Sequence, residues 1–137
     1  MNSKSFYIIY NPISGSGAAK KILKKLKKDL NFFSISYIIN KSEYKGHIKN
    51  LCQKVINYKK IIIIGGDGTF HEAINGLALN SKLNEMTIGF LPGGTGNSFM
   101  YDLKAPTYSQ AFSKILKGES KKIDILKLKF KNSIAYS

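Results

Sequence analysis

Four consecutive isoleucines followed directly by a glycine-rich segment limit most strongly what this chain can fold into. The isoleucines are residues 61–64, and the segment 65–69 that follows them reads GGDGT. Because no polar residue alternates with the isoleucines, we expect a strand buried on both faces, as in a parallel sheet covered by helices. Ligands of such sheets bind at the carboxyl ends of the strands. The segment 65–69 is therefore predicted to line a binding site.

The residue types in this segment predict that the ligand carries phosphate. Gly65, Gly66 and Gly68 lack a Cβ and allow positive φ, so backbone N–H groups can converge on an anion. Asp67 adds a carboxylate that can order Mg²⁺ or water, and Thr69 adds a hydroxyl donor. A tight turn that needed glycine only for its shape would not require this acid and hydroxyl. We therefore favour an anion site.

Strands and helices alternate along most of the chain. The sequence predicts strands at 5–10, 33–39, 60–64 and 87–91, and helices at 18–30, 47–56, 70–79, 98–103 and 108–116. This alternation indicates right-handed crossovers and a three-layer, Rossmann-like α/β fold with a parallel sheet between helices. The segment 122–130 breaks the pattern, because its alternating apolar and polar residues predict a half-exposed antiparallel strand.

Three glycine-rich loops, at 11–17, 65–69 and 92–97, each follow a predicted strand. In a parallel sheet they open on one edge, where backbone amides and helix N-termini favour a polyphosphate. The Walker pattern G-x-x-x-x-G-K-[ST] is absent, which argues against a P-loop NTPase. The dinucleotide pattern G-x-G-x-x-G also fails, because Lys20 and Phe99 stand where its third glycine belongs. Further hydroxyl donors in the loops are Ser14, Ser16 and Thr95.

The charge of the chain suits anionic surfaces. Its 137 residues carry a net charge of +14, from 22 lysines and no arginine against eight acids. Lysine favours diffuse attraction to phosphates or an anionic membrane, and no nucleic-acid-binding motif is present, so we expect no nucleic acid partner. The lysines of helix 18–30 fit either a solvated face or a membrane-docking face. Whether the chain forms a homo-oligomer stays open.

The single cysteine and the N-terminus indicate a cytoplasmic location. Cys52 has no second cysteine to pair with, which fits a reducing cytosol. The first ten residues lack the apolar run of a signal peptide, and no segment has the roughly 20 apolar residues of a membrane span. Any association with the inner face of a membrane is therefore expected to be peripheral.

Glu72 is expected in the first turn of the predicted helix 70–79, directly after segment 65–69. There it either caps the helix or orients Thr69 or a metal-bound water.

These loops resemble the diacylglycerol kinase catalytic domain family, which includes bacterial lipid kinases and sphingosine kinases. The segment 65–77 (GGDGTFHEAINGL), the opening loop 11–17 (NPISGSG) and the loop 91–99 (LPGGTGNSF) carry the resemblance. Ser42 matches a position where the family usually has a threonine that contacts ATP. The resemblance spans residues 5–128.

The resemblance implies ATP-dependent phosphorylation of a lipid hydroxyl on a diacylglycerol-like acceptor, with Mg²⁺, on a fold similar to NAD kinases and phosphofructokinases. Asp67 is then the acid essential to phosphoryl transfer, and Asp124 supports the metal through water. Ser98 departs from the family, since some bacterial members carry an acid there. The expected ATP-binding residues are Asn11, Ser14, Gly15, Ser42, Gly65, Gly66, Asp67, Gly68, Thr69, Glu72, Gly94, Thr95 and Asn97.

The family also implies a domain division. Residues 1–121 would form the ATP-binding domain, and residues 122–137 would begin a truncated C-terminal β domain, the part that supplies the lipid cleft in the family. We therefore expect the isolated chain to have little or no kinase activity. Two other interpretations stay open: an enzyme similar to NAD kinase, which shares the GGDGT loop, and a non-catalytic module that binds nucleotide or an anionic membrane through its lysines.

Overall fold

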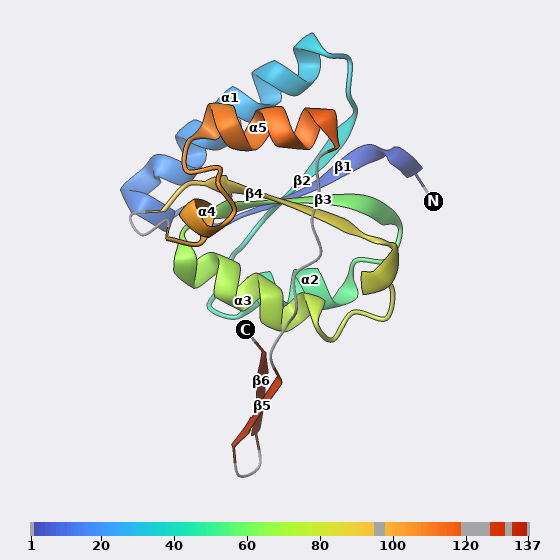
Figure 1. Ribbon diagram of the computed structural model, residues 1–137, viewed down its shortest axis with the longest axis vertical. Coiled ribbons are helices and arrows are strands. Elements are labelled where there is room, and N and C mark those ends of the chain that lie inside the picture. Colours follow the sequence, from blue (N-terminus) through green and yellow to red (C-terminus); the bar gives the residue numbers. More distant parts are fainter. Residues whose placement is uncertain (1, 95–97, 119–126, 131–132, 137) are drawn as a thin grey trace.

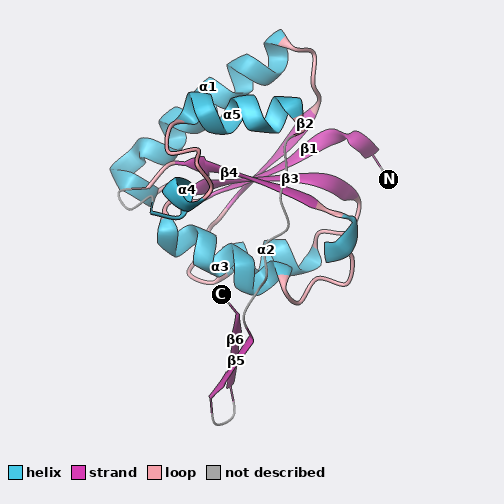
Figure 2. Ribbon diagram, viewed as in Figure 1, coloured by secondary structure: helices cyan, strands magenta, loops and turns pink. Residues whose placement is uncertain are grey.

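A four-stranded parallel sheet lies between two layers of helices (Figures 1 and 2). The structure, a computed structural model, describes residues 2–94, 98–118, 127–130 and 133–136. The strands, in the order β2-β1-β3-β4, are β1 (Asn2–Tyr10), β2 (Tyr37–Lys41), β3 (Tyr58–Gly65) and β4 (Thr87–Pro92). The longer helices are α1 (Ala18–Phe32), α2 (His47–Lys54), α3 (Asp67–Leu77) and α5 (Tyr108–Lys117). The predicted three-layer α/β architecture is confirmed.

Helices α1 and α5 cover one face of the sheet, and α2 and α3 cover the other (Figure 1). Strand β3 runs between β1 and β4 in parallel register, with Ile62 beside Ile8 and Gly89. All four isoleucines of β3 are at most 1% exposed, as expected for a strand covered on both faces. Burial of each such side chain contributes roughly 1.5–3 kcal/mol, so β3 supplies the centre of the core.

The second strand begins four residues later than predicted. Helix α1 continues to Phe32, and the N–H of Ile35 then donates to the carbonyl of Leu30 (2.9 Å). Ser34 has a φ of 55°, a left-handed conformation that breaks an extended chain. The strand predicted at 33–39 is therefore wrong at its start, and β2 pairs with β1 only from Tyr37 onward.

The C-terminal segment forms a separate hairpin. Strand β5 (Lys127–Phe130) pairs antiparallel with β6 (Ser133–Tyr136) in a two-stranded sheet. The predicted antiparallel strand is thus confirmed for residues 127–130, while residues 122–126 lie outside the described part of the chain. The division into domains at residue 121 stays a prediction.

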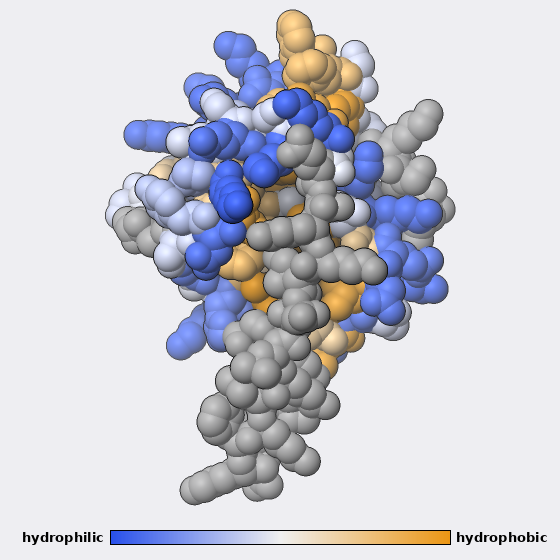
Figure 3. Space-filling model, in the orientation of Figure 1, coloured by the Kyte–Doolittle hydropathy of each residue, from blue (hydrophilic) through white to orange (hydrophobic). Residues whose placement is uncertain are grey.

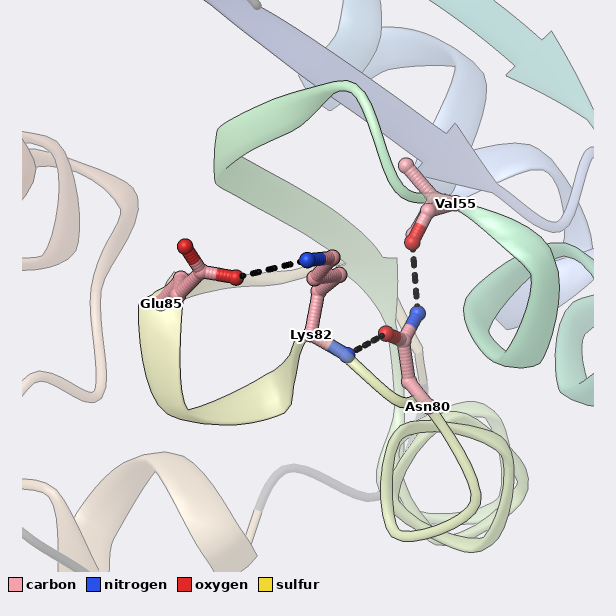
Figure 4. A network of polar contacts seen from close by, with 4 residues as sticks. All are labelled: Val55, Asn80, Lys82 and Glu85. Carbon is pink, nitrogen blue, oxygen red and sulfur yellow. Dashed lines mark hydrogen bonds and ion pairs between the residues drawn. The ribbon is translucent and has the colours of Figure 1, made fainter.

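Asn80 links the end of α2 to the loop that follows α3 (Figure 4). Its buried side chain donates from Nδ2 to the carbonyls of Cys52 (2.8 Å) and Val55 (2.6 Å). Its Oδ1 accepts from the N–H of Lys82 (2.8 Å), and Lys82 forms a surface ion pair with Glu85 (3.5 Å). One buried amide therefore satisfies backbone groups that would otherwise lose their bonds to water.

Helices α2 and α3 cross in close contact at Gly76. A Cβ on Gly76 would lie 2.3 Å from the carbonyl oxygen of Lys49 and 2.9 Å from the Cβ of Cys52. Glycine is therefore needed here for close packing, although it lowers helix propensity by about 1 kcal/mol relative to alanine. Cys52 is fully buried at this helix contact, and its burial raises the pKa of its thiol to about 12, with a smaller contribution from the negative charge of Glu72.

Gly76→Ala is expected to destabilise the fold by about 1–3 kcal/mol, because the added methyl group forces α2 and α3 apart. Urea unfolding followed by circular dichroism measures this effect. Gly68→Ala is the matched control in the same helix, since a Cβ there meets no atom within 4 Å. The control should be neutral or up to about 1 kcal/mol more stable, and equal stability of the two variants would contradict the packing argument.

Candidate functional site

The three glycine-rich loops meet at the carboxyl edge of the sheet, where they surround a hollow of about 400 Å³. Each loop follows a strand of the parallel sheet, so the topology brings segments far apart in sequence to one place. The residues that line the hollow are Asn11, Ser14, Gly15, Gly66, Asp67, Gly68, Thr69, Glu72 and Gly94. All nine belong to the site expected from the sequence.

The N-terminus of α3 opens on this hollow. The helix begins at Asp67, three residues earlier than predicted, so the segment 65–69 is the end of a strand and the first turn of a helix. Gly66 at its start provides no side-chain cap, and the first helical bond runs from the N–H of Phe70 to the carbonyl of Gly66 (3.0 Å). Helix N–H groups without partners, at the positive end of the helix dipole, are suited to binding an anion.

Close backbone contacts explain why Gly94 and Gly15 of the loops carry no side chain. A Cβ on Gly94 would lie 2.3 Å from the Cα of Gly66, and one on Gly15 would lie 2.7 Å from the carbonyl oxygen of Gly93. The N–H of Gly93 donates to the carbonyl of Gly65 (2.8 Å), which joins the second and third loops. The loops can therefore approach one another only because these positions carry no side chain.

Positive φ has a smaller role than the sequence suggested. Gly15 has a φ of 61°, but positive φ is not found at Gly65, Gly66 or Gly68, and Gly66 has a φ of −109°. Gly65 is required instead because a Cβ there would lie 2.5 Å from the Cβ of Thr69. The glycines of segment 65–69 thus do not use the positive φ that glycine allows.

Both carboxylate oxygens of Asp67 are bound by the start of α4 (Ser98–Asp102). The N–H of Phe99 donates to Oδ1 (3.0 Å), while the N–H and hydroxyl of Ser98 donate to Oδ2 (3.1 and 2.6 Å). These bonds, first the one from Phe99 and then the hydroxyl of Ser98, hold the pKa of Asp67 below its usual range. Asp67 is therefore ionised at neutral pH and fixed in orientation beside the hollow.

No pattern in the sequence connects Asp67 with Ser98 and Phe99. The three residues come together because the segments after β3 and β4 leave the same edge of the sheet. The hydroxyl of Ser98 supports the charge of Asp67 as a donor, whereas an acid at this position would oppose that charge.

Glu72 occupies a different position from the expected one. It is the sixth residue of α3, one turn beyond the first, and its Oε1 accepts a long bond from the N–H of Lys49 (3.4 Å). Lys49 lies in the first turn of α2, whose cap residue Gly46 provides no side-chain bond. Glu72 therefore contacts the N-terminus of a neighbouring helix while it lines the hollow.

The remaining expected site residues lie around the edge of the hollow or outside the described residues. The N–H of Ser42 donates to the carbonyl of Tyr10 (3.0 Å), which places Ser42 beside the first loop but not in the lining. Asn11 shapes that loop, because its Oδ1 accepts from the N–H of Ile13 (3.2 Å). Gly65 is not among the residues that line the hollow. Thr95, Asn97 and Asp124 lie outside the described residues.

The described residues contain no group of three or more His, Cys, Asp or Glu side chains placed to hold a metal ion. Asp67 and Glu72 are the two carboxylates that line the hollow. This donor set fits Mg²⁺, which commonly takes one or two carboxylates and completes its ligands with substrate phosphates and water.

The family model of the diacylglycerol kinase catalytic domain matches residues 5–128. This chain belongs to that family. It is 35% identical over 124 residues to a diacylglycerol kinase of Staphylococcus carnosus. The aligned region covers 88% of this chain and 40% of that relative. It is 32% identical to sphingoid long chain base kinase 4 of Schizosaccharomyces pombe, with 98% of this chain and 31% of the relative covered.

The fold of this chain is also similar to solved structures of diacylglycerol kinases. A diacylglycerol kinase from Bacillus anthracis superposes with a TM-score of 0.72 at 28% identity, covering 91% of this chain and 44% of that one. The chain thus spans less than half the length of each of these proteins. The fold and the family are therefore shared, and the match concerns the α/β part.

Ser98→Ala is expected to raise the pKa of Asp67 toward its ordinary value near 3.9, because the hydroxyl donor to Oδ2 is lost. Carboxyl-carbon NMR titration measures the pKa directly, and Ser98→Thr, which keeps a hydroxyl, is the control. A depressed native pKa stabilises the fold above the unfolded pKa, and this contribution is lost as pH falls through the native pKa. The stability difference between wild type and Ser98→Ala should therefore shrink from about pH 7 to about pH 3. An unchanged pKa would contradict this role for Ser98.

Proposed function

We propose that the hollow binds the phosphates of ATP together with Mg²⁺, and that the chain is the nucleotide-binding half of a lipid kinase with a diacylglycerol-like acceptor. The observation that carries the proposal is the uncapped N-terminus of α3 facing a hollow walled by three loops, in a chain of the diacylglycerol kinase family. Asp67, fixed beside that N-terminus, is the acid expected to be essential.

Backbone groups are proposed to make most of the phosphate contacts. The N–H groups of Asp67, Gly68 and Thr69 precede the first helical bond of α3, so they are available to phosphate oxygens. The hydroxyls of Ser14 and Thr69 belong to residues that line the same hollow and can donate further bonds. A hollow of about 400 Å³ is within the size range of small-molecule sites.

Mg²⁺ would be held by Asp67, with Glu72 as a second carboxylate at the hollow, and would neutralise charge on the transferred phosphoryl group. Asp67 remains the carboxylate throughout, because the donors from α4 stabilise its charged form. It thus serves to position the metal and phosphates and is poorly suited to take up a proton. The contributions of Ser42, Gly65, Thr95, Asn97 and Asp124 to the site stay predictions.

Gly68→Glu tests nucleotide binding directly. A Cβ at Gly68 meets open space, so the substitution is tolerated by the fold but places a carboxylate in the hollow. Repulsion of one added charge at about 4 Å is worth roughly 1–4 kcal/mol, so we expect about a 5- to 1,000-fold weaker affinity for ATP with Mg²⁺ in calorimetry. Gln53→Glu adds the same charge on the exposed side of α2 and is the control.

Two outcomes decide against the proposal. If Gly68→Glu binds ATP as tightly as the wild type does, the nucleotide binds elsewhere. If the wild type itself does not bind ATP, there is no ATP site.

Phosphate transfer is tested separately. With radiolabelled ATP and dispersed diacylglycerol, residues 1–137 alone are expected to transfer little phosphate. Preferential transfer to NAD would favour the NAD kinase interpretation.

A further inference from the structure

Helix α1 carries a row of lysines that ends in an exposed aromatic side chain. Lys20, Lys24, Lys28 and Phe32 are spaced four residues apart, so they follow one another along a single side of the helix for about 18 Å. The three lysines are exposed, and the side chain of Phe32 is 81% exposed. We refer to these four residues as the α1 stripe.

The layer around the α1 stripe is almost entirely basic. Helices α1 and α5 together hold eight lysines, six of them in α1, and one acid. That acid, Asp29, accepts a hydrogen bond from the hydroxyl of Tyr108 (2.6 Å) and lies between the two helices. No ion pair to a lysine of the α1 stripe is found among the described residues. Within the described part of the chain, no ion pair therefore neutralises the positive charge of the α1 stripe.

Apolar side chains gather at the end of the α1 stripe. Phe32 packs edge-on against Phe33 (5.0 Å between ring centroids), which reaches Phe112 of α5 (6.3 Å). Figure 3 shows this apolar surface at the top of the view, where Figure 1 draws the end of α1, with hydrophilic surface around it. Lysines beside exposed aromatic rings are typical of surfaces that bind the interface of an anionic membrane.

We propose that the α1 stripe docks on an anionic lipid surface, with the lysines at the headgroups and Phe32 inserted among them. This docking deepens the proposed lipid kinase function on which it rests, because α1 begins at Ala18, directly after the loop that lines the hollow. Lys20 thus lies in the first turn of the helix that follows this loop. None of the helices in the described part of the chain combines the length and apolar character needed to span a bilayer.

The lysines are tested by binding to phosphatidylglycerol-containing vesicles without ATP or diacylglycerol. Each lysine near an anionic surface contributes roughly fivefold in partitioning, so Lys20→Ala, Lys24→Ala and Lys28→Ala combined should weaken binding on the order of a hundredfold. The control combines Lys45→Ala, Lys54→Ala and Lys59→Ala, which remove the same charge from exposed positions outside the α1 layer. It should change binding several-fold at most.

The insertion is tested by fluorescence, since the chain has no tryptophan. Phe32→Trp introduces a single reporter that should shift its emission to shorter wavelength on phosphatidylglycerol vesicles and not on phosphatidylcholine vesicles. Tyr44→Trp, at a 56% exposed position beside α2, should show no shift. Equal loss of binding in the two lysine variants, no binding to anionic vesicles, or no shift for Phe32→Trp would overturn the proposal. None of these outcomes bears on ATP binding, so the two proposals fail separately.

Discussion

The close approach of glycine backbones at the carboxyl edge of the sheet is the constraint on which the rest of the site depends. Gly94 lies against the Cα of Gly66, and the N–H of Gly93 binds the carbonyl of Gly65. No side chain fits where these loops touch, so their backbones meet directly, and the register of β3 with β4 sets how the loops approach each other. Such a site is built on rigid elements, which is what positioning of a charged ligand requires.

Much of this arrangement follows from the sequence for a simple physical reason. The run at residues 61–64 must be buried, strands alternating with helices must be parallel, and the carboxyl ends of parallel strands share an edge. Those three steps bring together the three loops, which hold eight of the nine residues that line the hollow; the ninth, Glu72, lies in α3. The family resemblance of residues 5–128 is confirmed by the family model, while the ligand of the hollow remains a proposal.

What the sequence did not predict depends on where chain segments turn. The start of β2 depends on the left-handed Ser34, and α3 begins at Asp67 because Gly66 ends the strand. Likewise, the bond from Lys49 to Glu72 requires the crossing of α2 over α3 at Gly76. The first two features depend on the conformation of single residues, and the third joins residues 23 positions apart, so hydrophobic periodicity carries no information about any of them.

The bonds between Asp67 and α4 also affect how a metal would enter the hollow. Three donors already occupy the two oxygens of Asp67, and the adjacent position carries the hydroxyl of Ser98 in place of a second carboxylate. Few protein ligands are thus left for Mg²⁺, which needs six in octahedral geometry and retains its waters strongly. The phosphates of a nucleotide would supply the missing oxygens. It follows that metal and nucleotide would bind this hollow together, with the N-terminus of α3 and the metal sharing the neutralisation of phosphate charge.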